Sequence, residues 1–169
     1  GVLDGIHQAI DLAERKLRGL VIWQTGEPLS TGADLSGAME SLKGGRIAEF
    51  DAMVNRFQQT SMRIKFALVP VVSAIRGMAL GGGCEFQMHS ARTVAALESY
   101  VGLVEAGVGL LPGGGGCKEI ALRSAERAQF VQGGDVLPFL QKYFQTVAMG
   151  TVSGSALEAK ELGLLRATD

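Results

Sequence analysis

The sequence has few of the residues that mark specialised protein classes. Its 169 residues include two cysteines, two histidines and four prolines, and aromatic residues make up only 6%. Cys84 and Cys117 are not part of a CxxC pair and have no histidine at metal-ligand spacing, so the sequence predicts neither a zinc site nor a disulfide framework. We therefore expect no metal in this chain and two reduced thiols.

Charge of one sign and long apolar runs are also missing. The 16 Lys and Arg residues nearly balance the 17 Asp and Glu residues, which leaves no electrostatic case for nucleic acid or an anionic membrane as the main partner. No apolar run approaches the roughly 18 residues of a membrane span, and the opening GVLDGIHQAIDLAERK lacks the apolar region of a signal peptide. We expect a soluble, cytoplasmic protein.

What the sequence does have is a normal core composition and many glycines. Hydrophobic residues make up 47% and charged residues 20%, which is typical of a globular protein of one domain, here residues 1–169. The 24 glycines are about twice the usual share of roughly 7%. They concentrate in residues 77–83 and 102–116, so these two segments are where an unusual backbone is expected.

Hydrophobic periodicity predicts alternating helices and strands, and therefore an α/β fold with a parallel sheet or a layered superhelix. Trp23, which ends the first apolar run, is expected in the core. Ser155 and Glu158 have the spacing of a capping box at the start of the last helix. Helices are predicted over 2–18, 47–64, 82–89, from about 112, over 136–148 and over 156–162, and strands over 20–23, 71–75 and 93–97.

The stretch MALGGGCEFQM, residues 78–88, places three glycines between a predicted strand and a predicted helix. Glycines let a ligand approach the main chain, and the first N–H groups of a helix attract an anion. The anion could be a bound phosphate or an oxyanion that forms during a reaction. The spacing matches neither GxxxxGK[ST] nor GxGxxG, which disfavours phosphate, while simple close packing of the glycines stays open.

Two isolated carboxylates stand in these apolar, glycine-rich segments. Glu85 lies on the first turn of the helix predicted over 82–89, and Glu105 lies in VGLVEAGVGLLPGGGG. A buried carboxylate without a partner costs several kcal/mol or has a raised pKa. Two such groups can share general acid and general base work, whereas a surface Glu paired with a helix N-terminus would need no function.

Taken together, these segments resemble a known family. Four segments carry the resemblance, in the chain order TGADL, AIRGMALGGGCEF, VGLVEAGVGLLPGGGG and SALEAKELGLL. With these segments the chain resembles, over nearly its whole length, the enoyl-CoA hydratase/isomerase (crotonase) family. Within it the chain is most similar to the hydratase part of bacterial bifunctional 3-hydroxyacyl-CoA dehydrogenases. The resemblance implies a crotonase-like ββα superhelix, present here as an N- and C-terminally incomplete fragment of a longer chain.

The resemblance also implies roles for individual residues. The backbone N–H groups of Ala33 and Gly82 would form an oxyanion hole for the thioester oxygen. Glu85 and Glu105 would be the acid and base, and the backbone of Gly113 would help to orient Glu105. Four further residues are expected to bind the coenzyme A thioester, namely Gly32, Asp34, Leu35 and Gly81.

The implied activity is hydration of trans-2-enoyl-CoA to 3-hydroxyacyl-CoA in β-oxidation, with no cofactor in this segment. The partners would be acyl-CoA and either further copies in a trimer-based homo-oligomer or a fused dehydrogenase domain that brings NAD. Alternatives are a non-catalytic acyl-CoA-binding or assembly module, or another crotonase reaction such as isomerisation or thioester hydrolysis. Lys43, Arg46 and Lys65 are candidate phosphate partners, while His7 and His89 are expected to be surface or packing residues without a titratable neighbour.

Overall fold

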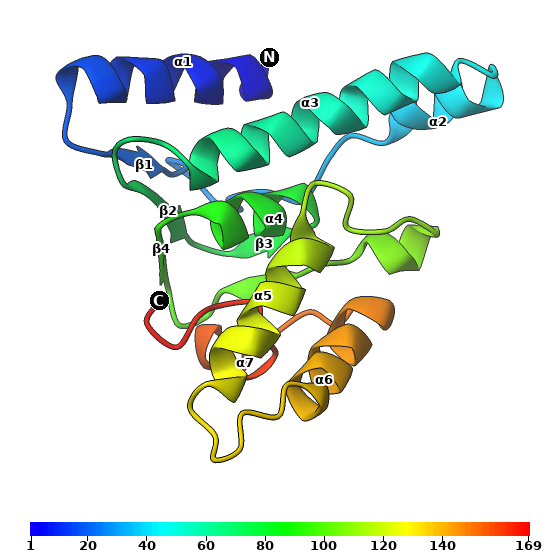
Figure 1. The fold of residues 1–169 in the computed structure, drawn as a ribbon. Helices are drawn as coiled ribbons and strands as arrows, with labels where there is room; N and C mark the ends of the chain where they lie inside the picture. The colour runs from blue at the N-terminus through cyan, green and yellow to red at the C-terminus, as the bar shows by residue number, and fades with distance from the viewer.

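Alternating strands and helices wind through the molecule in a layered arrangement (Figure 1). A computed structural model describes residues 1–169, apart from the side chain of Ala38. The helices are α1 (Val2–Lys16), α2 (Ser36–Lys43), α3 (Ile47–Lys65), α4 (Gly82–His89), the 3-10 turn η1 (Glu105–Val108), α5 (Gly116–Ala128), α6 (Leu137–Ala148) and α7 (Ala156–Glu161). The strands are β1 (Leu20–Ile22), β2 (Val71–Ile75), β3 (Met78–Leu80), β4 (Arg92–Ala95) and β5 (Tyr100–Gly102).

The strands form two separate parallel sheets. The first has the order β1-β2-β4, with Val72 opposite Arg92, and the second pairs β3 with β5. Ser30 forms a parallel bridge to Ala79, which extends the second sheet by the chain that follows β1. Along the chain, a segment in the first sheet is therefore followed by a segment in the second sheet and then by a helix. This repeated order of strand, strand and helix is the ββα superhelix.

The core follows from this layering. The larger apolar cluster joins β2, β3, β5 and α4 to α5, α6 and α7, and it includes Met88, Leu103 and Leu164 with no exposed surface. A smaller cluster of Ile10, Ile64 and Val71 fixes α1 and α3 against the first sheet. Helix α4 lies at the centre of the fold with six of its eight residues buried, so a functional group on α4 is packed against neighbouring elements.

Most predicted elements are confirmed, and the differences have physical causes. β3 and β5 were not predicted because each is three residues long and runs directly into glycine, so neither gives the β-branched apolar run that marked β1. Helix α5 begins at Gly116 rather than near residue 112, because Gly115 has a left-handed backbone with φ of +116°. The prediction that Trp23 is in the core was wrong: it is 60% exposed, next to β1 at the edge of its sheet.

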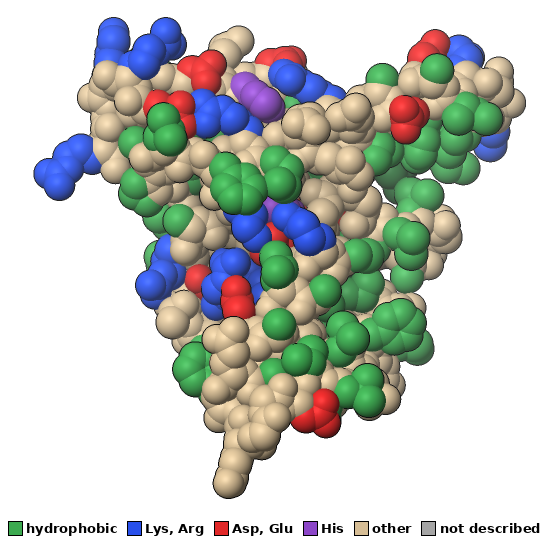
Figure 2. All heavy atoms as spheres, in the orientation of Figure 1, with side chains coloured by type: hydrophobic (Ala, Val, Ile, Leu, Met, Phe, Trp, Pro, Cys, Tyr) green, Lys and Arg blue, Asp and Glu red, His purple; other side chains and the backbone are tan. Residues whose placement is uncertain are grey.

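The last helices end at the surface with apolar side chains exposed. Hydrophobic side chains gather over α6 in the lower part of Figure 2, and Phe144 is 67% exposed. Ser155 caps α7 by accepting a hydrogen bond from the Glu158 backbone N–H at 3.1 Å, as its spacing predicted, although Glu158 in turn accepts from Gly154 rather than from Ser155. Within the described residues, every helix is too short or too polar to cross a membrane.

Candidate active site

The three consecutive glycines make the sharp turn from β3 into α4. Gly81 has φ of +52°, a backbone conformation that side chains disfavour, and its N–H donates to the Gly102 carbonyl at 2.9 Å. A Cβ on Gly83 would lie 2.4 Å from the Ser30 Cβ, so only glycine lets the loop after β1 pass this closely. The glycines thus have a packing role, and that packing brings the residue 30–33 loop against the start of α4.

Glu85 projects from the first turn of α4 into the glycine-rich turn before α5. It is only 3% exposed, and its Oε1 accepts a hydrogen bond from the Gly116 backbone N–H at 2.9 Å. A Cβ on Gly114 would lie 2.4 Å from Glu85 Oε2, so the backbone of this turn is in direct contact with the carboxylate. Burial raises the pKa of Glu85 to about 7, with a further contribution from the charge of Glu105.

Glu105 approaches the turn between β3 and α4 from η1. Its Oε1 would lie 3.5 Å from a Cβ on Gly81, and that Cβ would also lie 3.6 Å from the Gly32 Cα. Oε2 of Glu105 is buried without a hydrogen-bond partner among the described residues. Burial raises the pKa of this carboxyl as well, so both acids are in environments that disfavour their charged forms.

The two predicted oxyanion donors are adjacent in sequence to Gly81 and Gly32, which contact each other at this turn. Gly82 is the first residue of α4, where a helix leaves its N–H groups without intrahelical acceptors. Ala33 follows Gly32, which contacts the glycine turn, and it is exposed. Neither backbone N–H donates a hydrogen bond to another described residue, whereas the neighbouring N–H groups of Gly32 and Gly81 do. Among the described residues these two N–H groups are therefore left without a protein acceptor, as donors of an oxyanion hole would be.

The remaining predicted site residues differ in their contacts. Gly32 has φ of +104° and lies over Leu80, and Leu35 directly precedes α2. Asp34 accepts a hydrogen bond from the Ser36 N–H at 2.9 Å, which lowers the pKa of its carboxyl. The Gly113 carbonyl accepts from Gln58 at 2.7 Å, and among the described residues Gly113 makes no hydrogen bond to Glu105.

Sequence reasoning missed the glycines that actually touch a carboxylate. Gly114 and Gly116 contact the Glu85 carboxylate. The segment PGGGG indicated an unusual backbone in the sequence, but it did not indicate which carboxylate this backbone would contact.

Two candidate phosphate partners already have acidic partners: Arg46 pairs with Glu49, and Lys65 pairs with Glu119. The expectation that neither histidine has a titratable neighbour was wrong for His89, whose Nε2 is 3.0 Å from Lys118 Nζ.

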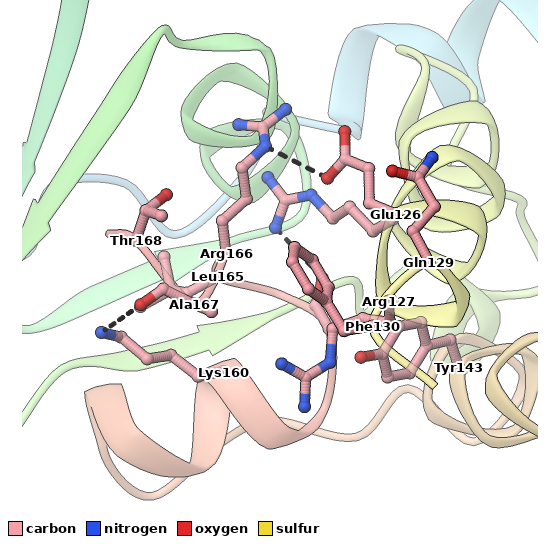
Figure 3. Close-up of a pocket in the computed structure, with 12 residues that line it drawn as sticks. Glu126, Arg127, Gln129, Phe130, Tyr143, Lys160, Leu165, Arg166, Ala167 and Thr168 are labelled. Carbon is pink, nitrogen blue, oxygen red and sulfur yellow. Dashed lines mark hydrogen bonds and ion pairs between the residues drawn. The ribbon is translucent and has the colours of Figure 1, made fainter. Parts of the chain in front are cut away.

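A cavity of about 260 Å³ lies elsewhere, between α5, α6 and the segment after α7 (Figure 3). Arg127, Phe130, Lys160 and Arg166 are among its lining residues, and neither Glu85 nor Glu105 lines it. Because it is remote from both acids, this cavity is not where their chemistry would take place. Within the part of the chain that the structure describes, no group of three or more His, Cys, Asp or Glu side chains is placed to hold a metal ion.

Comparison with solved structures shows the fold. An enoyl-CoA hydratase from Polaromonas sp. JS666 superposes with a TM-score of 0.76 at 22% identity, over 96% of this chain and 58% of that chain. One from Bacillus anthracis gives a TM-score of 0.72 at 24% identity, over 97% of this chain and 57% of that chain. The layered ββα arrangement is therefore the crotonase fold.

Sequence comparison shows the family. A Bacillus subtilis (strain 168) protein described as a probable 3-hydroxyacyl-CoA dehydrogenase is 42% identical over 99% of this chain and 21% of its own length. A probable enoyl-CoA hydratase from the same strain is 32% identical over 70% of this chain and 46% of its own length. The chain thus spans about a fifth of the first relative and less than half of the second. The sequence model of the family described as enoyl-CoA hydratase/isomerase matches residues 2–130, so the chain belongs to the enoyl-CoA hydratase/isomerase family.

Proposed function

We propose that this chain catalyses hydration of trans-2-enoyl-CoA to 3-hydroxyacyl-CoA. The observation that carries the proposal is a pair of buried carboxyl groups with raised pKa, in which the charge of Glu105 acts on Glu85 and Glu105 lies against the glycine turn that starts α4. Family membership supports the choice of a CoA thioester as the substrate class. Addition of water changes no oxidation state, so this step needs no redox cofactor.

The thioester oxygen would accept hydrogen bonds from the N–H groups of Ala33 and Gly82. As water adds at C3, negative charge moves onto this oxygen and forms an enolate. Donors fixed in advance stabilise that charge without reorganising, and removal of one typically costs about 3 to 4 kcal/mol of barrier. The partial positive charge at the start of α4 acts in the same direction.

The two carboxyl groups would divide the proton transfers. One, ionised, takes a proton from the attacking water, and the other, protonated, delivers a proton to C2 on the same face. Burial holds the Glu85 pKa near neutrality and the charge of Glu105 opposes ionisation of both together, so a state with one proton on the pair is accessible near pH 7. Such a shared proton is what general acid and base catalysis requires.

The relatives supply a wider context for the proposal. Since one relative is described as a 3-hydroxyacyl-CoA dehydrogenase, we place this chain as a crotonase domain, residues 1–169, beside a fused NAD-dependent dehydrogenase domain of β-oxidation. The product of hydration would be the substrate of that domain. CoA binding would involve Gly32, Asp34, Leu35 and Gly81, and a trimer-based homo-oligomer is the alternative assembly.

The test is the rate of crotonyl-CoA hydration by the full-length protein and its Glu85→Gln and Glu105→Gln variants. Each variant should lower kcat at least about a hundredfold with little change in affinity for acetoacetyl-CoA. Glu161→Gln, the same change at an exposed residue of α7, is the control and should keep parental kcat. Full activity in either active-site variant would refute the acid and base assignment.

Two other outcomes separate the alternatives. Tight acetoacetyl-CoA binding with no reaction by the parent would identify a non-catalytic acyl-CoA-binding module. Products with a shifted double bond or free CoA would identify isomerisation or thioester hydrolysis instead of hydration.

A further inference from the structure

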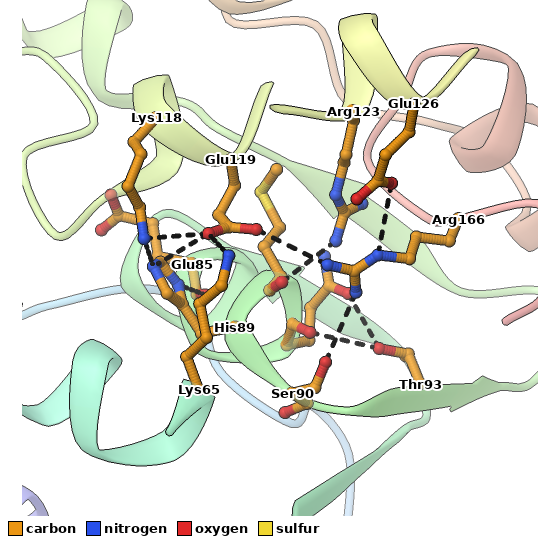
Figure 4. Close-up of polar contacts among 12 residues, drawn as sticks. Lys65, Glu85, His89, Ser90, Thr93, Lys118, Glu119, Arg123, Glu126 and Arg166 are labelled. Carbon is orange, nitrogen blue, oxygen red and sulfur yellow. Dashed lines mark hydrogen bonds and ion pairs between the residues drawn. The ribbon is translucent and has the colours of Figure 1, made fainter. Parts of the chain in front are cut away.

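A further buried carboxylate, Glu119, lies close to the candidate site. It has no role in the reaction proposed above. It stands in the first turn of α5 with no exposed surface. Figure 4 shows three basic side chains pointing toward it, from the adjacent Lys118, from α3 and from the segment after α7. Its Oε1 pairs with Lys65 of α3 and lies 2.9 Å from Lys118 Nζ, and its Oε2 lies 3.6 Å from Arg166.

His89, at the end of α4, connects this cluster to the candidate site. Its Nδ1 is 2.7 Å from the carbonyl oxygen of Glu85, and its Nε2 is 3.0 Å from Lys118 Nζ and 3.6 Å from Glu119 Oε1. A carbonyl can only accept, so Nδ1 must carry the hydrogen. An ammonium group can only donate, so Nε2 must be the acceptor, and the ring is neutral in the Nδ1–H tautomer.

The same ring supports the turn that holds the Glu85 carboxylate. A Cβ on Gly115 would lie 2.7 Å from His89 Nε2, so the backbone of the turn rests directly on the imidazole. The next residue, Gly116, donates its N–H to Glu85 Oε1. His89 therefore supports Glu85 in two ways. It contacts the backbone carbonyl oxygen of Glu85 directly, and it contacts the glycine turn that binds the Glu85 carboxylate.

The charges around the ring favour this arrangement over others. Burial lowers the pKa of His89, Lys118 and Lys65 also oppose protonation of the imidazole, and the Glu119 charge favours it. Glu119 also neutralises the two lysines and so keeps the Lys118 ammonium at Nε2 rather than in solvent, toward which its side chain is already 41% exposed. Removal of the Glu119 charge would leave two like charges next to each other and release Lys118 from the ring.

Resting on the hydration chemistry proposed above, we infer that Glu119, through Lys118, locks His89 in the Nδ1–H tautomer, and that His89 in turn fixes the position of Glu85. His89 and Glu119 are positioning residues in this scheme. Neither touches the substrate, so their loss should lower turnover and leave CoA binding intact.

The experiment measures kcat and KM for crotonyl-CoA hydration by the full-length protein with His89→Leu and His89→Asn. The two replacements have the same number and branching of side-chain heavy atoms, but only Asn places a donor where Nδ1 now stands, facing the Glu85 carbonyl. His89→Leu should lower kcat about tenfold or more, as expected when a reacting group is displaced by a fraction of an ångström, with KM and acetoacetyl-CoA affinity within about twofold of the parent. His89→Asn should restore most of the lost kcat.

Glu119→Gln should show the same loss of kcat at constant KM, and if it does not fold, the histidine pair alone decides. Equal kcat for the Leu and Asn variants, or parallel loss of kcat and acetoacetyl-CoA binding, would overturn the inference. Failure of the proposed function is distinguishable, because it would appear as a parent without hydratase activity or as a fully active Glu85→Gln variant.

Discussion

Replacement of Gly114 by alanine tests whether the glycine-rich turn sets the position of Glu85. A Cβ at this residue would lie 2.4 Å from Glu85 Oε2 and 2.2 Å from a ring carbon of Phe57. The Phe57 ring stacks on Phe86 with centroids 4.6 Å apart, so moving the ring would also disturb that contact. Since ordinary contacts begin at 3.4 Å, the carboxylate must shift by about 1 Å.

A displacement of about 1 Å in a reacting group typically costs about a hundredfold in rate. Gly114→Ala should therefore lower kcat for crotonyl-CoA hydration by about that factor, and overpacking should lower the free energy of unfolding by about 1 to 3 kcal/mol. Gly113→Ala is the matched control, because a Cβ there meets nothing closer than 3.7 Å. Both variants are compared by steady-state kinetics of crotonyl-CoA hydration and by urea unfolding. Equal kcat for the two variants would refute the reasoning.

Three further predictions concern buried groups. The pKa of Glu85 is raised from its ordinary value near 4.5 to about 7 by burial, so ionisation destabilises the fold by an amount that is absent below about pH 4.5 and complete, at about 3 kcal/mol, above about pH 7. Glu85→Gln should then unfold at higher urea than the parent at about pH 8 and lose that advantage at about pH 4; a constant difference at both pH values would contradict this. Glu119→Ala should cost about 1 to 3 kcal/mol in urea unfolding because it leaves the half-buried cations of Lys65 and Arg166 without their acidic partner, whereas Glu126→Ala at the surface should cost less than about 1 kcal/mol, and similar costs would argue against the charge cluster. Iodoacetamide should modify the exposed Cys117 and spare Cys84, whose thiol is fully buried with its pKa raised to about 12, and peptide mapping that finds both labelled under native conditions would show that α4 is not held as described.

The sequence was most informative where a segment combined a strong pattern with an unusual residue. The apolar run VVSAI predicted β2 with its correct ends, and the glycines before Glu85 predicted both the turn and the start of α4. Short-range patterns carried these predictions because β-branched residues and helix starts are local signals. Local patterns left open whether the fold was a parallel sheet or a layered superhelix. The resemblance to the family, which the family match confirms, predicted the layered superhelix.

The remaining features depend on contacts between distant parts of the chain. Nothing near Glu119 in the sequence shows that Lys65, more than fifty residues earlier, will pair with it. His89 was misjudged for the same reason, since its charged neighbours come from α5. Trp23 was misjudged because an apolar strand does not reveal whether it lies at the edge or at the centre of a sheet.

The most direct test of the account is a crystal structure of the full-length protein with acetoacetyl-CoA. The thioester oxygen should lie about 2.7 to 3.1 Å from the backbone nitrogens of both Ala33 and Gly82, with the carboxylates of Glu85 and Glu105 facing the acyl carbons. A thioester oxygen held by other groups, or an acyl chain that does not pass between the two glutamates, would contradict it.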